Sequence, residues 1–166
     1  EVYEHSANCF KNNEEVKDLH IRFKENFLSE LLKLKEKGTE LNKKLISDLK
    51  DQGQLLASLS MDSLKEYFGE FEIVKAEEDI FEDIIEYEDN EYKFKGFIDL
   101  VLKTSDGKIH IIDWKTCSWG WDARKRSDPM VTYQLTYYKK YYAQKYNIEP
   151  KKIETHFALV KRTAKK

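Results

Sequence analysis

The feature that most constrains the fold is a pair of apolar, β-branched runs on either side of Asp106-Gly107. An Asp-Gly pair between two such runs is typical of a tight β-hairpin. Asp99 stands seven residues before Asp106, and Asp113 stands seven residues after it. Paired strands lie ~4.8 Å apart, so a hairpin would place the two carboxylates close together. The chain from 95 to 116 is therefore predicted to form two antiparallel strands that carry two neighbouring acidic side chains.

A cationic side chain accompanies these carboxylates. Side chains alternate between the two faces of a strand, so we expect Lys115 on the face of Asp113, while Trp114 points away and leaves its backbone carbonyl near the site. Asp113 lies within an apolar strand, where an unpaired carboxylate is costly. Two carboxylates beside one ammonium suit a divalent cation next to a charge that steadies a phosphate. A surface hairpin with solvated charges is the alternative, and the apolar setting of Asp113 favours the metal site.

Three short motifs follow one another in the second half of the chain. They are G-x-x-D (Gly96 to Asp99), D-x-K (Asp113 to Lys115) and Q-x-x-x-Y (Gln134 to Tyr138). In this order and at these separations they resemble the PD-(D/E)XK nuclease superfamily, and within it the RecB-like exonuclease branch. D-x-K alone carries little information, so the resemblance depends on all three motifs. It covers residues 77–162.

The resemblance implies a restriction-endonuclease-like core of the α/β (α+β) class, with a mixed central sheet flanked by helices. It also implies a metal-dependent nuclease that hydrolyses DNA phosphodiester bonds, an exonuclease more than a site-specific endonuclease. Processing of DNA ends in recombination, repair or phage replication is the expected setting, with a helicase or recombination protein as a further partner. A nuclease-fold DNA-binding module without turnover and an RNA endonuclease are the alternatives.

The resemblance also assigns roles to individual residues. Asp99 and Asp113, with the Trp114 carbonyl, would ligate one or two Mg²⁺ or Mn²⁺ ions. Lys115 would position or deprotonate the attacking water, or neutralise the phosphate oxygens. Gln134 would help to orient the catalytic centre and the nucleic-acid backbone.

Two further metal ligands are implied, each with a rival position. The acidic residue on the strand before G-x-x-D is Glu78 or Glu77, and only one can reach the site because adjacent strand residues face opposite sides. We favour Glu78. The histidine on an early helix is His5 or His20. We favour His5, although Glu1 stands where the family motif has a glycine.

The charge of the chain is unevenly distributed. The net charge is −2, yet residues 115–166 hold 13 Lys or Arg against 4 Asp or Glu, and the other 114 residues hold 16 against 27. This asymmetry predicts a basic face for nucleic acid, with binding that weakens as salt rises. Aromatic and cationic groups there would stack on bases and hold phosphates. The candidate nucleic-acid contacts are Thr116, Trp121, Arg124, Lys125 and Tyr138.

Composition limits the remaining possibilities. A chain of 166 residues with 40% hydrophobic residues is most simply one globular domain, here 1–70 mainly helical and 71–166 with the catalytic sheet and helix. Cys9 and Cys117 are too few for a disulfide framework or a four-thiolate cluster, so we expect no iron–sulfur cluster. We also expect no signal peptide, no membrane span, and a cytoplasmic or otherwise intracellular location, nucleoid-associated and phage-encoded proteins included.

Apolar spacings of three and four predict helices in the first 70 residues. The first would begin at Asn12 or Asn13 and end at Gly38. Thr39 would cap the second, which would stop near Gly53, and short helical pieces would follow as far as residue 69.

From residue 72 the period changes towards two, which predicts strands. They are expected near 73–86, 92–103 and 108–114, with a turn at Asp89-Asn90 and an irregularity in the first strand near 79–82. A loop or short turn would then lead to Asp128-Pro129, a helix start that predicts a helix to residue 146. A final strand is expected over 152–162.

Overall fold

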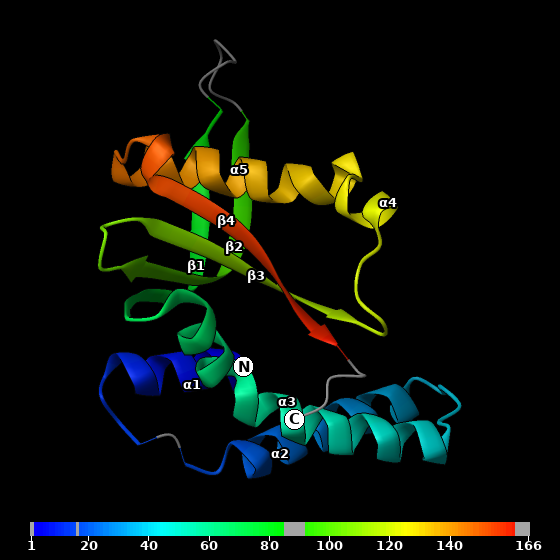
Figure 1. Ribbon diagram of the computed structural model, residues 1–166. Helices are drawn as coiled ribbons and strands as arrows, with labels where there is room; N and C mark the ends of the chain where they lie inside the picture. Colours follow the sequence, from blue (N-terminus) through cyan, green and yellow to red (C-terminus); the bar gives the residue numbers. More distant parts are fainter. Residues whose placement is uncertain (1, 16, 85–91, 162–166) are drawn as a thin grey trace.

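A four-stranded sheet lies between two layers of helices in the computed structural model, which describes residues 2–15, 17–84 and 92–161 (Figure 1). The strand order is β1-β2-β3-β4; β1, β2 and β3 are antiparallel neighbours, and β4 is parallel to β3. This mixed sheet with a helical N-terminal half confirms the predicted fold class. The elements are α1 (Val2–Lys11), α2 (Leu19–Glu36), α3 (Lys43–Phe68), β1 (Phe71–Asp83), β2 (Lys93–Thr104), β3 (Ile109–Cys117), α4 (Ala123–Arg126), α5 (Pro129–Tyr146), a 3₁₀ turn (Pro150–Lys152) and β4 (Ile153–Lys161).

The predicted hairpin joins β2 to β3. Gly107 has a φ of +80°, a conformation that glycine adopts without strain, and its N–H donates to the Thr104 carbonyl at 2.9 Å. The Asp106 carboxylate accepts from the Lys108 N–H at 3.2 Å. The antiparallel register pairs Leu100 with Ile112. The residue before Leu100, Asp99, therefore lies across from the residue after Ile112, Asp113. The turn chemistry therefore sets the alignment of the two carboxylates.

Each face of the sheet buries its own apolar cluster. On one face, Ile80, Ile98 and Ile111 pack with Leu135 and Tyr142 of α5. On the other, α1 and α3 cover a second cluster that includes Ala7, Met61, Leu64, Leu102 and Ile112. Both faces are thus removed from water where β2 and β3 pair, from Leu100 to Leu102 and from Ile109 to Ile112, as the apolar sequences there require.

The N-terminal helices differ from the prediction. α1 ends at Lys11, and α2 begins only at Leu19, so neither Asn12 nor Asn13 caps a helix. Asn42 caps α3 in place of Thr39, because its side chain accepts from the Leu45 N–H at 3.0 Å. α3 then runs without a break to Phe68. No helix in the described part of the chain is long and apolar enough to cross a membrane.

Gly53 lies inside α3, where the sequence predicted a break. A Cβ at this position would lie only 2.0 Å from the Phe23 ring of α2, so the glycine provides the space in which that ring packs. The glycine thus marks a close helix–helix contact instead of a helix end.

The C-terminal elements follow the prediction more closely. Asp128 caps α5 through the Met130 N–H at 3.0 Å, with Pro129 in the first turn. The segment expected as a loop before it contains the short helix α4. In β1 the irregularity lies between Ile73 and Lys75 and at Glu77, not at 79–82. The turn predicted at Asp89-Asn90 falls outside the described residues.

Candidate active site

The two carboxylates of the hairpin meet at the end of the β2–β3 ladder. Asp99 Oδ2 accepts a hydrogen bond from the Trp114 N–H at 2.7 Å, which holds this side chain beside the neighbouring strand. Asp113 is only 2% exposed. Burial raises the pKa of the Asp113 carboxyl and the nearby Asp99 raises it further, while Lys115 acts in the opposite direction. A buried carboxylate beside a second, half-buried one needs a cationic partner.

Lys115 and Gln134 supply two partners to Asp113. The Lys115 ammonium lies 2.6 Å from Asp113 Oδ2, in an ion pair without a well-directed hydrogen bond. The Gln134 amide donates to Asp113 Oδ1 at 2.8 Å. Lys115 comes from the same strand as Asp113, two residues on, whereas Gln134 comes from α5. The D-x-K and Q-x-x-x-Y motifs therefore contact each other directly.

Tyr138 links the third motif to this network. Gln134 and Tyr138 share one face of α5, and the Gln134 amide also lies 3.1 Å from the Tyr138 hydroxyl oxygen. The Tyr138 ring packs over Gly96, where a Cβ would approach the ring to 2.8 Å. The glycine of G-x-x-D thus makes room for the tyrosine of Q-x-x-x-Y. Tyr138 is buried and its hydroxyl contacts Gln134, so its contact with nucleic acid stays a prediction.

The structure favours Glu77 over the expected Glu78 as the third acidic residue. β1 pairs Ala76 with Leu100 and Glu78 with Ile98, which places Glu77 across from Asp99. Burial raises the pKa of Glu77, and Asp99 adds to the rise. Glu77 has a φ of +52°, a local irregularity that sequence patterning does not reveal.

Glu78 is engaged elsewhere. Its buried Oε1 accepts from the Lys145 ammonium at 2.7 Å and from the Tyr146 hydroxyl at 2.6 Å. These partners belong to the last turn of α5, and this contact raises the pKa of Lys145. Glu78 therefore anchors α5 to β1, and its carboxylate is not brought to Asp99.

Neither histidine candidate is brought to the carboxylates. The His5 ring lies against Cys9 one turn along α1, with Nε2 3.5 Å from the sulfur, in a hollow that α2 residues also line. Successive helix residues point about 100° apart, and it is Glu4 that acts electrostatically on Glu77. His20 is exposed on α2. The expectation of a His5 ligand is thus not met, because α1 turns His5 towards α2.

A family model gives an independent comparison. The model of the PD-(D/E)XK nuclease superfamily matches residues 12–166. The chain belongs to the PD-(D/E)XK nuclease superfamily. Membership indicates a metal-dependent nuclease, a hydrolase of phosphodiester bonds. A search of curated proteins finds no match to the chain.

The side chains around Asp113 are of the kind that suits the divalent cation that PD-(D/E)XK nucleases use, although in the described part of the chain the oxygens of the three acidic residues do not gather within 4.8 Å of one another. Asp99, Asp113 and Glu77 offer carboxylate oxygens, the donors that hard cations prefer. Asp113 Oδ2 is buried and has the Lys115 ammonium beside it at 2.6 Å, so a cation bound there would share this carboxylate with Lys115. Asp99 raises the pKa of both other carboxyl groups, a repulsion that a bound cation would relieve.

A chain of aromatic and cationic groups leads away from the candidate active site of this superfamily member. The Lys115 ammonium lies 5.8 Å from the centre of the Phe157 ring, and that ring lies 4.9 Å from the Trp121 ring. Lys125 in turn lies over Trp121 at 5.9 Å. Arg124 is exposed on the same short helix. Phe157 was missed in the sequence because only the parallel pairing of β4 with β3 brings it next to Asp113.

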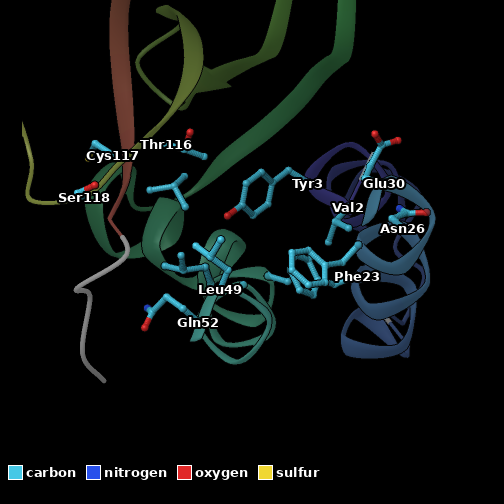
Figure 2. Close-up of a pocket in the computed structure, with 15 residues that line it drawn as sticks. Val2, Tyr3, Phe23, Asn26, Glu30, Leu49, Gln52, Thr116, Cys117 and Ser118 are labelled. Atoms are coloured by element: carbon cyan, nitrogen blue, oxygen red, sulfur yellow. The ribbon is translucent and has the colours of Figure 1, made fainter. Parts of the chain in front are cut away.

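Thr116 has a different environment from Lys115. It lines a cavity of about 730 Å³ between the end of β3 and the N-terminal helices, as Figure 2 shows. Tyr3 points into this cavity and stacks on Trp114, with ring centres 4.8 Å apart. Alternation along β3 explains the difference, because Thr116 and Trp114 face the α1 side while Lys115 faces Phe157. Thr116 thus lies on the opposite side of the strand from Lys115.

Proposed function

We propose that this chain is a Mg²⁺- or Mn²⁺-dependent deoxyribonuclease of the RecB-like branch, acting as an exonuclease on DNA ends. Residues 1–166 would act as one domain, with the N-terminal helices as its scaffold. The observation that carries the proposal is the direct contact of Asp113 with both Lys115 and Gln134, beside Asp99. The acidic pair, its lysine and its glutamine are all present. This favours an enzyme that cleaves its substrate over a binding module that has lost catalytic activity.

The metal ligands in this proposal are Asp99, Asp113 and Glu77, with the backbone carbonyl of Trp114. Bound there, a divalent cation would lower the pKa of a coordinated water and offset charge on the phosphate. Asp99 is held by the Trp114 N–H, and Asp113 by the Gln134 amide. These hydrogen bonds fix the carboxylates before substrate arrives, which spares the cost of ordering them during the reaction.

Lys115 would act on the phosphate. Its ammonium lies at the margin of the buried carboxylates and is partly exposed, so it can reach an oxygen of the scissile group. A fixed positive charge at that point neutralises the negative charge that develops on the phosphoryl oxygens. Gln134 would keep Asp113 oriented while this happens.

DNA is the proposed substrate because of the groups next to Lys115. Trp121 and Phe157 offer aromatic rings, and Lys125 and Arg124 offer cations, a combination that binds unpaired nucleic acid by stacking and phosphate contacts. A strand end that enters along this route would reach Lys115 first. Recombination, repair or phage replication, with a helicase or recombination protein as partner, is the setting that this activity suits.

The decisive experiment is Asp113→Asn, which removes a negative ligand without changing side-chain volume. We expect it to abolish cleavage of labelled DNA while circular dichroism and the melting temperature remain close to those of the wild type. Asp62→Asn, a matched change at an exposed position of α3, should leave the rate unchanged. Millimolar Mn²⁺ should raise the melting temperature of the wild type, because the cation binds only the folded site.

The substrate is tested with matched single- and double-stranded DNA and RNA, with and without Mg²⁺ or Mn²⁺. Release of nucleotides from DNA ends supports the proposal. Normal cleavage by the Asp113→Asn protein would contradict the assignment of the metal site. Cleavage of RNA alone would keep the site and overturn the substrate, and tight DNA binding by a folded protein without any cleavage would indicate a binding module.

A further inference from the structure

Two histidines and a glutamate gather away from the carboxylates, near the beginning of the β3–β4 pair. They are His110 on β3 and Glu154 and His156 on β4, and one donor atom of each lies within 4.8 Å of the others. His110 Nδ1 lies 3.0 Å from His156 Nε2 and 3.7 Å from Glu154 Oε2. The His110 ring packs against Phe68 of α3, whereas Asp113 contacts α5, so the two clusters lie on opposite faces of the sheet.

We propose that His110, Glu154 and His156 form a second metal site, selective for Zn²⁺ or a similar transition-metal ion. Ligands about 2.0 to 2.2 Å from a tetrahedral ion lie roughly 3.3 Å from one another. The separations of 3.0 and 3.7 Å lie on either side of this value, and the remaining pair, Glu154 and His156, lies within 4.8 Å, so the side chains would draw together around an ion. Two imidazoles and one carboxylate favour such ions over Mg²⁺. Three protein ligands leave a fourth position for water.

The surrounding hydrogen bonds direct His110 Nδ1 towards this ion. Thr104 Oγ1 donates to Asp106 Oδ1 at 2.5 Å and lies 3.0 Å from His110 Nε2. A hydroxyl that gives its proton to a carboxylate must accept from the imidazole. The proton of His110 is therefore on Nε2, and its Nδ1 accepts from His156 Nε2 at 3.0 Å, a proton that His156 would move to its own Nδ1 when an ion binds. The Nε2–H of His110 stays on Thr104 Oγ1. Such a hydrogen bond behind a ligand is the usual support of a metal-bound histidine.

Glu154 and His156 are also suitably arranged. Lys108 occupies Glu154 Oε1 at 2.5 Å, which leaves Oε2 on the side of His110. Burial lowers the pKa of both imidazoles, which favours the neutral form that metal ligands require. His156 borders a cavity of about 450 Å³ that Tyr67 and Phe68 also line, which gives the ion a way in. A bound ion would tie β4 to β3.

Cobalt and zinc titrations of the whole chain test this proposal. One equivalent of Co²⁺ should give the visible absorption of a four-coordinate nitrogen and oxygen site, and Zn²⁺ should remove it. A long-range ¹H–¹⁵N spectrum should show that Zn²⁺ shifts the imidazole nitrogens of His110 and His156, while exposed His20 is unaffected. Zn²⁺ at a hundred times its Kd should raise the melting temperature by roughly 5 to 10 °C.

Variants separate this site from the others. The Co²⁺ spectrum should be lost in His156→Asn and retained in Asp113→Asn, which changes only the carboxylate site. A sulfur-to-cobalt charge-transfer band would instead place the metal at His5 and Cys9 and overturn the proposal. Unshifted His110 and His156 signals in the wild type under saturating Zn²⁺ would overturn it too, whether or not the His156→Asn protein folds.

Discussion

The sheet half and the N-terminal helical half of the molecule are held together very differently. Ile98, Leu100 and Ile111 in the sheet are at most 1% exposed, whereas α2 buries no residue at all. Leu28 and Leu32 of α2 are 47% and 61% exposed. Both regions have apolar periodicity in the sequence, and it corresponds to a packed core in the sheet and on the faces of α1 and α3 that cover it, but not in α2. Periodicity therefore indicates an element, while burial depends on what the rest of the chain places against it.

The functional side chains follow the same division. Asp99, Asp113, Lys115 and Gln134 all lie on the sheet or on α5, where tertiary contacts fix them. α2 packs mainly on α3, through contacts such as Phe23 over Gly53. Segments with few buried contacts open at low free energy. We therefore expect changes in the sheet half to alter chemistry and stability, and equivalent changes in α2 and its contacts to alter little.

The largest difference between the halves is expected in turnover. Lys115→Ala should lower the cleavage rate by about 10² to 10⁴, the usual loss when a preorganised charge on the transition state is removed. DNA affinity should fall much less, because Lys115 is one of 13 basic residues in 115–166. Lys44→Ala, at an exposed position of α3, is the matched control and should change neither quantity. Single-turnover rates and a binding titration without metal measure the two effects.

Equal losses of rate and affinity in Lys115→Ala would mean that this lysine is chiefly a phosphate anchor. The proposed action on the transition state would then be wrong, while the metal site itself would stand.

Substitutions at two glycines, one in each half, are expected to have effects of intermediate size, chiefly on stability. In Gly96→Ala the new methyl group would meet the Tyr138 ring at 2.8 Å and the Phe94 ring at 3.0 Å inside the core. Overpacking of this kind costs about 1 to 3 kcal/mol. Displacement of Tyr138 should also move Gln134 and lower the cleavage rate. Urea denaturation and the cleavage rate check both expectations.

Gly53→Ala is the matched change in the helical half. Its methyl group would meet the Phe23 ring at 2.0 Å, a closer clash than at Gly96. However, α2 has no buried residue to hold it in place, and alanine favours the helix by roughly 1 kcal/mol. We expect a stability change within about 1 kcal/mol and an unchanged cleavage rate. A larger loss in Gly53→Ala than in Gly96→Ala would show that α2 is as firmly held as the sheet.

The hairpin and its motifs could be predicted because they depend on local chemistry. Asp106-Gly107 specifies the turn, and the turn specifies that Asp99 faces Asp113. The α5 start at Asp128-Pro129 is equally local. The interior position of Gly53 could not be predicted, because a glycine in a packed helix contact and a glycine at a helix end look alike in one sequence.

The choice of the remaining ligands depended on structure beyond the motifs. Glu77 and Glu78 are adjacent, and the decision rests on a positive φ at Glu77 and on Lys145 and Tyr146, nearly 70 positions later. The fate of His5 likewise depends on how α1 is rotated above the sheet. Tertiary packing decides how one helix or strand is oriented towards another, and a short sequence motif does not encode that packing.

The smallest expected effect concerns the charge on the two halves. Replacing Arg124 and Lys125 together by Ala should weaken DNA binding and flatten its dependence on salt, because each lost phosphate contact removes roughly 0.7 to 0.9 from the slope of log affinity against log salt. Lys33 and Lys35 form the matched pair on α2, where we assign the helix to the scaffold. Their replacement should leave both quantities nearly unchanged. DNA-binding titrations at several salt concentrations compare the two double variants. Similar losses of affinity in both would show that DNA binding spreads over the whole molecule, with the helical half as part of the DNA surface.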